Sequence, residues 1–471
     1  MITMKNRLAI MLILLSMGHD TFSAELDLNS YRKQVESVDP HYQSAQSQVK
    51  GAQAVHDSYE NSTDAQLVAR TSYGDDRRPT LNPDFQGDRT MMRTLSLGVQ
   101  QQTSWGPRFE FTQNVVQTRI ENASPAAVPL SDFYDSYPKI DVTVPLWRNF
   151  MGHQIRIEQK IKRGHVQERI LQSEMRWIHA NGTIEMTFYS YLAATEQYQM
   201  LKEILQHAEK ILKWTTTRAQ RGLSDSADIF QAEAAVKARQ LELEDALANL
   251  QAIGRRFNSR RGIQSEQVSE ILLADDLPMS KLLLDGQVNK VSRNTSLNKT
   301  HTLVQEQTYL SLRQLSLPQL DLNLSAQWNG RDPELSPAID ETFDSNQSNF
   351  YIGLQFTMPL DVPKYLRVER GLLELSASEK LRNAAEQRDG QVEWENFVAR
   401  GTSLYKQVSI LRELEVTQKQ KADAERARLV NGRSTTFQVL SFEQDYISTR
   451  SRRISAELQA RQYIVELPLY E

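Results

Sequence analysis

Hydrophobic and polar residues alternate with a period of two in two separate regions of the chain. In the first region, Ile140, Val142 and Val144 alternate with Asp141 and Thr143 and lead into a Pro-Leu pair at 145–146. In the second, apolar positions alternate with polar ones over 320–328 and again over 354–358, before a Pro-Leu pair at 359–360. This alternation predicts strands with one apolar and one polar face.

Further strands are predicted upstream of the first region. Residues 95–99 alternate in the same way, and the turn Trp105-Gly106-Pro107 leads to Phe109 and Phe111. Residues 65–73 form another candidate strand. Each run has about 9–11 residues, which is the length that crosses a bilayer when tilted in a barrel. A soluble antiparallel sheet has the same alternation, and alternation alone favours it.

Between these regions the apolar positions recur at steps of three and four, as in amphipathic helices. The first such seam comprises Ile229, Ala232, Val236, Leu243, Ala246, Leu250 and Ile253, interrupted by Arg239. A weaker seam 210 positions later comprises Val439, Phe442, Tyr446, Thr449, Arg453, Ala456, Ala460 and Tyr463. The spacing predicts helices packed side by side, in a coiled coil or in an ordinary helical bundle.

Proline placement separates the two kinds of structure. Seven prolines lie between Pro79 and Pro145, and none lies between Leu146 and Leu277. A second cluster ends at Pro363 and is followed by another proline-free stretch, 364–467. Because a proline inside a helix costs about 3 kcal/mol, long helices are expected in the two gaps.

The same order of segments occurs twice. Helix, strands, long helix, glycine turn and shorter helix run over 25–262 and again over 284–471, with a linker at 263–283 that contains ILLADDLP and a possible short strand. The two glycine turns lie in RGLSDSADIFQAEA and NGRSTTFQVLSFEQ, with Gly222 and Gly432 at an offset of 210. Two copies in register indicate an internal duplication.

The N-terminus and the composition narrow the class of protein. Residues 1–24 have two basic residues, an apolar run and small residues at Ser23 and Ala24, as in a cleaved signal peptide. No other segment approaches 18 apolar residues, so entry into a membrane would have to use β-strands. There is no cysteine, and the net charge of −4 gives no argument for nucleic-acid binding.

Taken together, these features resemble the TolC-like outer membrane efflux protein (outer membrane factor) family over nearly all of the mature chain. The resemblance implies an α+β membrane protein with about four strands per chain. Three chains would form one outer-membrane β-barrel of about twelve strands, continued by a long periplasmic α-helical barrel. Such homotrimers are passive exit ducts in tripartite efflux or type I secretion. They contact outer membrane lipid and dock onto a periplasmic adaptor and an inner-membrane pump.

The resemblance also implies roles for residues at the two glycine turns. The adaptor-docking tips would comprise Arg221, Gly222, Leu223, Asn431, Gly432 and Arg433. Alternatively, the glycines only end helices.

The closed end of the duct is expected at the same tips, and the candidate constriction residues are Asp225, Asp228, Ser434, Gln438 and Ser441. Family members often have two acids after the second turn, where this chain has Gln438 and Ser441. Ser434 and Leu429 replace the basic residue and tyrosine that latch the best known members. Asp228 also fits a helix N-terminal acid that interacts with the macrodipole.

Other functional classes fit less well. The eight histidines are scattered, and no HExxH, nucleophile elbow or P-loop motif occurs, so neither an enzyme nor a metal or cofactor site is expected. A soluble periplasmic coiled-coil protein would explain the helices and the signal peptide, but not the amphipathic strands. The sequence does not identify the cargo, the pump or the adaptor, and it leaves open whether 94–117 is a hairpin inside or outside the barrel.

Overall fold

The computed structural model describes residues 25–59, 62–222, 225–284, 290–344, 347–358 and 360–470. The expected signal peptide lies outside these ranges. The chain divides into two compact units. One combines residues 50–173 with 293–390, and the other combines 25–49, 174–292 and 391–471. Each unit therefore draws on both of the predicted repeats, and each is described by itself.

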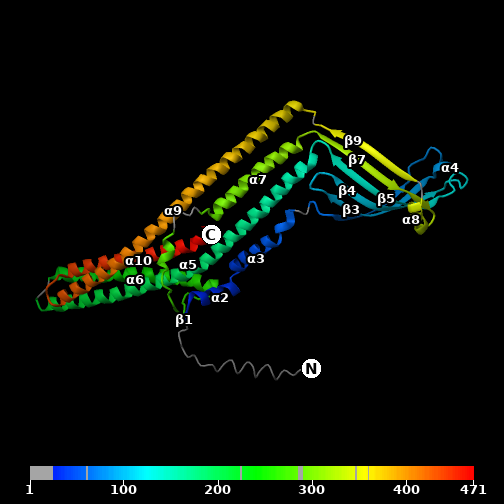
Figure 1. Cartoon of the computed structure of the whole chain (residues 1–471). Helices are drawn as coiled ribbons and strands as arrows, with labels where there is room; N and C mark the ends of the chain where they lie inside the picture. Colours follow the sequence, from blue (N-terminus) through cyan, green and yellow to red (C-terminus); the bar gives the residue numbers. More distant parts are fainter. Residues whose placement is uncertain are drawn as a thin grey trace, which may run out of the picture. The chain divides into compact units, whose positions relative to one another are not determined.

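The first unit contains a seven-stranded antiparallel sheet (Figure 1). Six strands follow one another in the order β2-β3-β4-β5-β7-β9, and the short β8 pairs with β5. Their bounds are β2 Gln66–Asp76, β3 Arg89–Gln102, β4 Arg108–Glu121, β5 Asp132–Pro145, β7 Gln319–Trp328, β8 Gly330–Asp332 and β9 Ser348–Thr357. All the predicted strand positions are confirmed.

The expected number of about four strands is too low. Besides the four strands β2, β5, β7 and β9, the chain adds the hairpin β3–β4, whose register with β2 and β5 is continuous on both sides. The hairpin at 94–117 therefore lies inside the sheet. The alternation of apolar and polar residues predicted all six strands, whereas the family resemblance implied only about four.

Helices complete this unit on the side of the sheet where the long helices begin. They are α7 Arg293–Leu315 and parts of α3 Pro40–Ala54, α5 His153–Gln220 and α9 Val362–Val430. The loop between β7 and β9 carries α8 Leu335–Asp344, and the loop between β2 and β3 carries α4 Pro83–Gln86. Short 3₁₀ turns lie at His56–Tyr59 and Phe150–Gly152. None of the described helices has a stretch apolar and long enough to span a bilayer.

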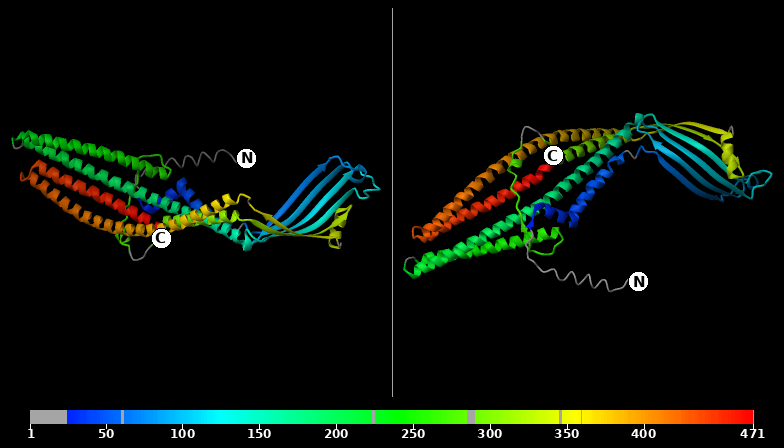
Figure 2. Two further views of the ribbon diagram at one scale, coloured as in Figure 1. Left: turned by 90° about the horizontal axis from the view of Figure 1, so that it is seen from above. Right: turned by 60° about the horizontal axis from the view of Figure 1, so that its bottom comes forward.

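The second unit consists of two helical hairpins and a small sheet. The remainder of α5 pairs with α6 Ser226–Arg260, and the remainder of α9 pairs with α10 Thr436–Glu466. Figure 2 shows the two hairpins side by side, and Met200 and Ile204 of α5 share a buried cluster with Ile447 of α10. At the other end, α2 Leu28–Val38 packs on α5, and β1 Glu25–Leu26 pairs in parallel with β6 Ile271–Leu272. A 3₁₀ turn at Leu467–Tyr470 follows α10.

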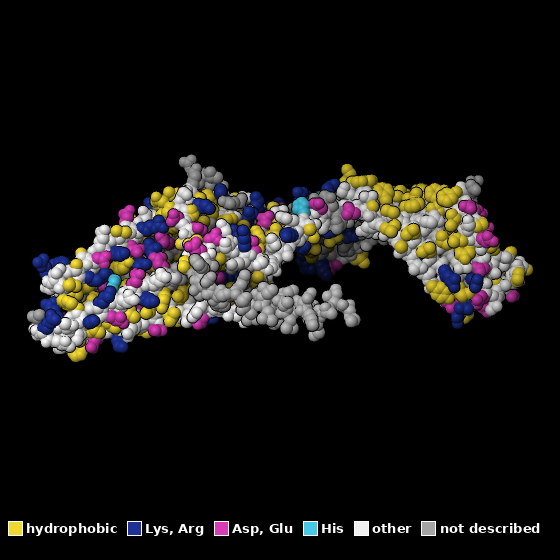
Figure 3. Space-filling model, turned by 90° about the horizontal axis from the view of Figure 1, so that it is seen from below, with side chains coloured by type: hydrophobic (Ala, Val, Ile, Leu, Met, Phe, Trp, Pro, Cys, Tyr) yellow, Lys and Arg dark blue, Asp and Glu magenta, His cyan; other side chains and the backbone are white. Residues whose placement is uncertain are grey.

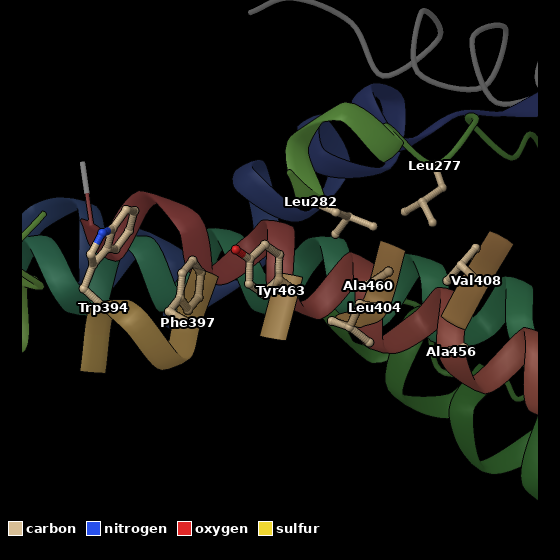
Figure 4. Close-up of a cluster of buried hydrophobic side chains, with 9 residues drawn as sticks. All are labelled: Leu277, Leu282, Trp394, Phe397, Leu404, Val408, Ala456, Ala460 and Tyr463. Atoms are coloured by element: carbon tan, nitrogen blue, oxygen red, sulfur yellow. The ribbon is translucent and has the colours of Figure 1, made fainter. Parts of the chain in front are cut away.

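The segment 263–283, expected as a linker, takes part in the core. Its Leu277 and Leu282 belong to one buried cluster with aromatic and aliphatic side chains of α9 and α10 (Figure 4). Leu282 is fully buried and lies in the 3₁₀ turn Met279–Leu282. The rings of Phe397 and Tyr463 stack in the same cluster, with centroids 4.3 Å apart. The segment therefore fixes the two helices rather than merely connecting the repeats.

A second cluster joins α2 to α5 and α6. The rings of Tyr31 and Phe257 stack at 4.1 Å, and the Tyr31 hydroxyl donates a hydrogen bond of 3.2 Å to the Phe257 carbonyl. Both side chains are completely buried. Burial also raises the pKa of Tyr31, which keeps the phenol neutral.

Truncation of this aromatic stack should destabilise the helical unit. Phe257→Ala removes a fully buried ring, which typically costs about 3–5 kcal/mol. We expect the thermal midpoint of the helical circular dichroism signal to fall by several degrees. Phe230→Ala on the same helix is the control, because its ring is 68% exposed. Equal midpoints for the two variants would contradict this account of the core.

Candidate functional site

The first candidate tip is the turn between α5 and α6. After α5 ends at Gln220, the N–H of Gly222 donates to the Ala219 carbonyl at 2.8 Å. Gly222 has φ of 72°, as predicted for a helix-ending glycine. Leu223 lies outside the described residues. The helix α6 then begins after Asp225, whose extended backbone is that of an N-cap residue.

The second tip has the same construction between α9 and α10. The N–H of Gly432 donates to the Leu429 carbonyl at 2.9 Å, and the N–H of Arg433 donates to the Arg428 carbonyl at 2.8 Å. These two bonds form a Schellman motif, with Gly432 at φ 70°. The Thr435 hydroxyl then caps α10 by accepting from the N–H of Gln438.

The surroundings of both glycines are open. A Cβ atom added to Gly222 or Gly432 would have no other atom within 4 Å. Arg221, Asn431 and Arg433 are exposed around them. Within the chain, therefore, only the positive φ favours glycine at these positions, and the bare backbone of each turn is accessible to another molecule.

Buried contacts hold the two tips together. Thr215 of α5 and Thr436 of α10 bring their hydroxyl oxygens to 3.5 Å, and both side chains are buried. Just beyond them, Ile211, Leu429 and Val439 form a small apolar cluster. The two hairpin ends thus form one structural element, although they lie 210 positions apart in the sequence.

The predicted constriction residues occupy the starts of α6 and α10. Asp228 lies in the first turn of α6, where a carboxylate stabilises a helix. Gln438 and Ser441 are exposed. The Ser434 hydroxyl hydrogen-bonds to the Glu425 carboxylate, so Ser434 is engaged within its own hairpin.

A buried ion pair near the second tip was missed in the sequence. Arg426 of α9 donates to Glu443 of α10 at 2.8 Å and to Asp423 at 2.7 Å. Glu443 is only 2% exposed. Burial raises the pKa of Glu443, while the Arg426 guanidinium opposes the rise. Glu443 falls on the same helical period as the buried Val439 and Tyr446, and an acid on that apolar seam is a signal that could have identified this pair.

A larger charge network lies farther from the tips. Arg453 of α10 binds Glu196 of α5, Glu415 of α9 and Glu457 of its own helix. Arg450 approaches Glu196 and Glu415 at 3.5 and 3.6 Å. These ion pairs connect α5, α9 and α10 in a region with a thin apolar core.

The two faces of the sheet differ sharply in chemistry. On one face the apolar side chains are uncovered, and Figure 3 shows hydrophobic side chains gathered over the sheet. They include Leu67, Leu95, Leu97, Val99, Phe111, Ile140, Phe350, Ile352, Leu354 and Phe356, which are 39–76% exposed. On the other face Ser96, Thr112 and Asn114 are at most 9% exposed. The sheet therefore curves toward its polar side.

The concave polar face forms a hollow of about 780 Å³. Its lining includes Arg108, Glu110, Lys139, Asp141 and Asn323. Glu110 accepts a hydrogen bond from Arg70 at 2.8 Å, and Lys139 pairs with Asp141 at 3.0 Å. Within the described part of the chain, no group of three or more His, Asp or Glu side chains is arranged to hold a metal ion.

Comparison with known proteins shows which proteins this chain resembles. Residues 96–256 match the family described as outer membrane efflux protein. The outer-membrane channel OprN is 14% identical, with a TM-score of 0.58 over 94% of this chain and 89% of that chain. VceC from Vibrio cholerae is 15% identical, with a TM-score of 0.57 over 94% of each chain. The MtrE channel of Neisseria gonorrhoeae is 12% identical, with a TM-score of 0.58 over 94% of this chain and 88% of that chain.

The fold is therefore that of outer-membrane channels with a strand domain and long helices. The resemblance to outer membrane efflux proteins that the sequence indicated is confirmed. No curated protein matches the chain significantly.

The buried pair near the second tip predicts a pH-dependent defect. Arg426→Met removes the cation that pairs with the buried Glu443 carboxylate, and we expect the free energy of unfolding to fall by about 3 kcal/mol at pH 8. A carboxyl whose pKa is raised on folding stabilises the folded state most at low pH, and that stability is lost as pH rises through the folded pKa. The defect should therefore shrink between pH 8 and pH 5 in thermal melts.

The double variant Arg426→Met/Glu443→Gln is the control, since it has no buried carboxyl at this position. Its melting curves should show no comparable gain at pH 5. If the single and double variants respond to pH in parallel, Glu443 is not the titrating group.

Proposed function

We propose that this chain is the outer-membrane component of an export system, working as a passive duct rather than as an enzyme. The uncovered apolar face of the curved sheet carries this proposal. In a soluble sheet that face would be covered, and an exposed patch of this size would promote aggregation. Lipid is the solvent that stabilises it, and the polar concave face then lines a water-filled passage.

Closure of the passage requires more than one copy. The edge strands β2 and β9 are not paired with each other, and open edges are not tolerated in a bilayer. A ring of three identical chains removes the edges, in agreement with the trimers that the family resemblance implies. The helices and their tips extend into the periplasm in this proposal, after removal of residues 1–24 as a signal peptide.

The glycine tips are proposed as the docking site for a periplasmic adaptor that joins the duct to an inner-membrane pump. Their support is the bare, open backbone at both turns and the exposed Arg221, Asn431 and Arg433 beside them. A partner can approach such a backbone more closely than a surface covered with side chains. Leu223 belongs to the same proposed surface by its place in the sequence.

A soluble periplasmic coiled-coil protein is the second candidate. Its support is the narrow seam of α6 and α10, where Ala232 and Val439 are buried as the helical period predicts. It leaves the apolar face of the sheet unexplained. Fractionation separates the two candidates, because a heat-modifiable trimer in the outer membrane is expected only of the duct.

The docking proposal predicts a loss of export without a loss of assembly. In the variant Gly222→Val/Gly432→Val, a β-branched residue is forced to positive φ and a side chain is added to each bare turn. We expect the trimer to form, while efflux and chemical cross-linking to the adaptor fall at least tenfold.

The matched control is Gly222→Asn/Gly432→Asn, because asparagine tolerates the left-handed conformation but still adds a side chain. If close approach of a partner matters, this variant also fails to export. If it exports normally, the glycines only end helices and the docking surface lies elsewhere.

A constriction at the start of α6 predicts altered ion flow. Three copies would place three Asp228 carboxylates near one axis, and a negative ring favours cations. We expect Asp228→Ala to lower cation selectivity and to change single-channel conductance at low salt by about twofold or more. Asp245→Ala is the control, because this exposed acid lies about 25 Å farther along the same helix. If the conductance of Asp228→Ala is unchanged, Asp228 acts only as an acid at the N-terminus of α6.

A further inference from the structure

The hairpin β3–β4 has the geometry of an insertion into a four-stranded unit. Its two ends meet: the N–H of Asp88 donates to the Glu121 carbonyl at 3.1 Å, and the Asn122 amide donates to the Asp88 carboxylate at 2.9 and 3.0 Å. A connection from 88 to 122 would therefore bypass the hairpin. β2 and β5 would then become neighbours with the same antiparallel sense.

The two inserted strands nevertheless match the rest of the sheet in their length and in their apolar and polar faces. β3 and β4 have 14 residues each, more than the about 9–11 that cross a bilayer. Leu97 continues the apolar face beside Ala69 of β2, and Phe111 continues it beside Ile140 of β5. On the polar face, Arg70 reaches across β3 to Glu110 of β4 at 2.8 Å. Neither face is interrupted at the insertion.

The turn of this hairpin is also fixed at the end where the helices begin. Gly106 and Gly152 approach so closely that a Cβ on Gly152 would lie 2.0 Å from the Ser104 carbonyl oxygen. The Gln102 amide donates to the Gly106 carbonyl at 2.7 Å within the turn. The hairpin is therefore anchored against the segment that leads into α5, and it is a structural part of the sheet.

The two remaining edges fit a second copy of this chain. β2 has 11 residues and β9 has 10, neither contains proline, and both are exposed along nearly their whole length. Because neighbouring strands alternate in direction along a path of six, β9 of one copy and β2 of the next run antiparallel. Their apolar residues, such as Leu67 and Ile352, then fall on the same face.

We infer that the closed assembly contains eighteen strands, six from each of three copies, rather than the twelve of a four-stranded subunit. The inference rests on the trimeric duct proposed above. Barrel diameter grows about linearly with strand number, so the barrel would be about one and a half times as wide as one of twelve strands. The partner at each edge is another copy of this chain, and the insertion sets the width of the outer opening.

Disulfide trapping in the full-length protein tests the strand order, because the chain has no cysteine of its own. Ala69→Cys/Leu97→Cys and Phe111→Cys/Ile140→Cys join register partners and should form bonds within one chain. Ala69→Cys combined in turn with Ile352→Cys, Leu354→Cys or Phe356→Cys should link copies into a covalent trimer for at least one pair. Leu97→Cys/Leu354→Cys is the control and should link nothing. A bond within one chain for Ala69→Cys/Ile140→Cys, which places β2 beside β5, would overturn the inference.

Imaging of the purified trimer by electron cryomicroscopy then counts the strands. We expect eighteen in the unaltered protein. In a variant that lacks 89–121 and joins Asp88 to Asn122, we expect twelve, with a diameter of about two-thirds. Twelve strands in the unaltered protein would refute the inference, whether or not the variant assembles. Cross-linking to the adaptor is measured separately. An eighteen-stranded barrel that does not dock would contradict only the docking proposal, and a twelve-stranded barrel that docks would contradict only this inference.

Discussion

Hydrogen bonding of the strand backbones is the constraint on which the rest of this structure depends. Each interior strand pairs on both sides, but β2 and β9 leave one edge each without a partner in the described chain. The apolar face of the same sheet is uncovered. In water both features are unfavourable, whereas in a ring of copies surrounded by lipid both are satisfied. In the proposed duct, oligomerisation and membrane insertion are thus two consequences of one sheet.

In the helical unit, long helices are held together without a thick apolar core. Small apolar clusters alternate along the helices with ion pairs such as Arg453–Glu415 and Arg426–Glu443. Burial of charge is costly unless it is paired, so these pairs specify which helix faces meet more than they add stability. A layer of helices packed in this way can contact water on both sides, which is consistent with the low fraction of hydrophobic residues, 39%.

The tips combine two simple devices, a glycine at positive φ and a capped helix start. Leu429, where the family resemblance implied a latching tyrosine, is 3% exposed and packs with Ile211 and Val439. The Ser434–Glu425 hydrogen bond, within one hairpin, stands near the same position. Contacts within this chain thus engage both positions.

The sequence by itself determined the elements, because period-two and helical patterns, prolines and the glycines at 222 and 432 act locally. It located α10 and every long strand, and it predicted the conformation of both turns. Only the tertiary structure decided that β3–β4 lies inside the sheet, that Leu282 is a core residue and that Arg426 meets Glu443. Those facts depend on which distant segments become neighbours, and alternation along one strand carries no information about its partner or about which face meets solvent.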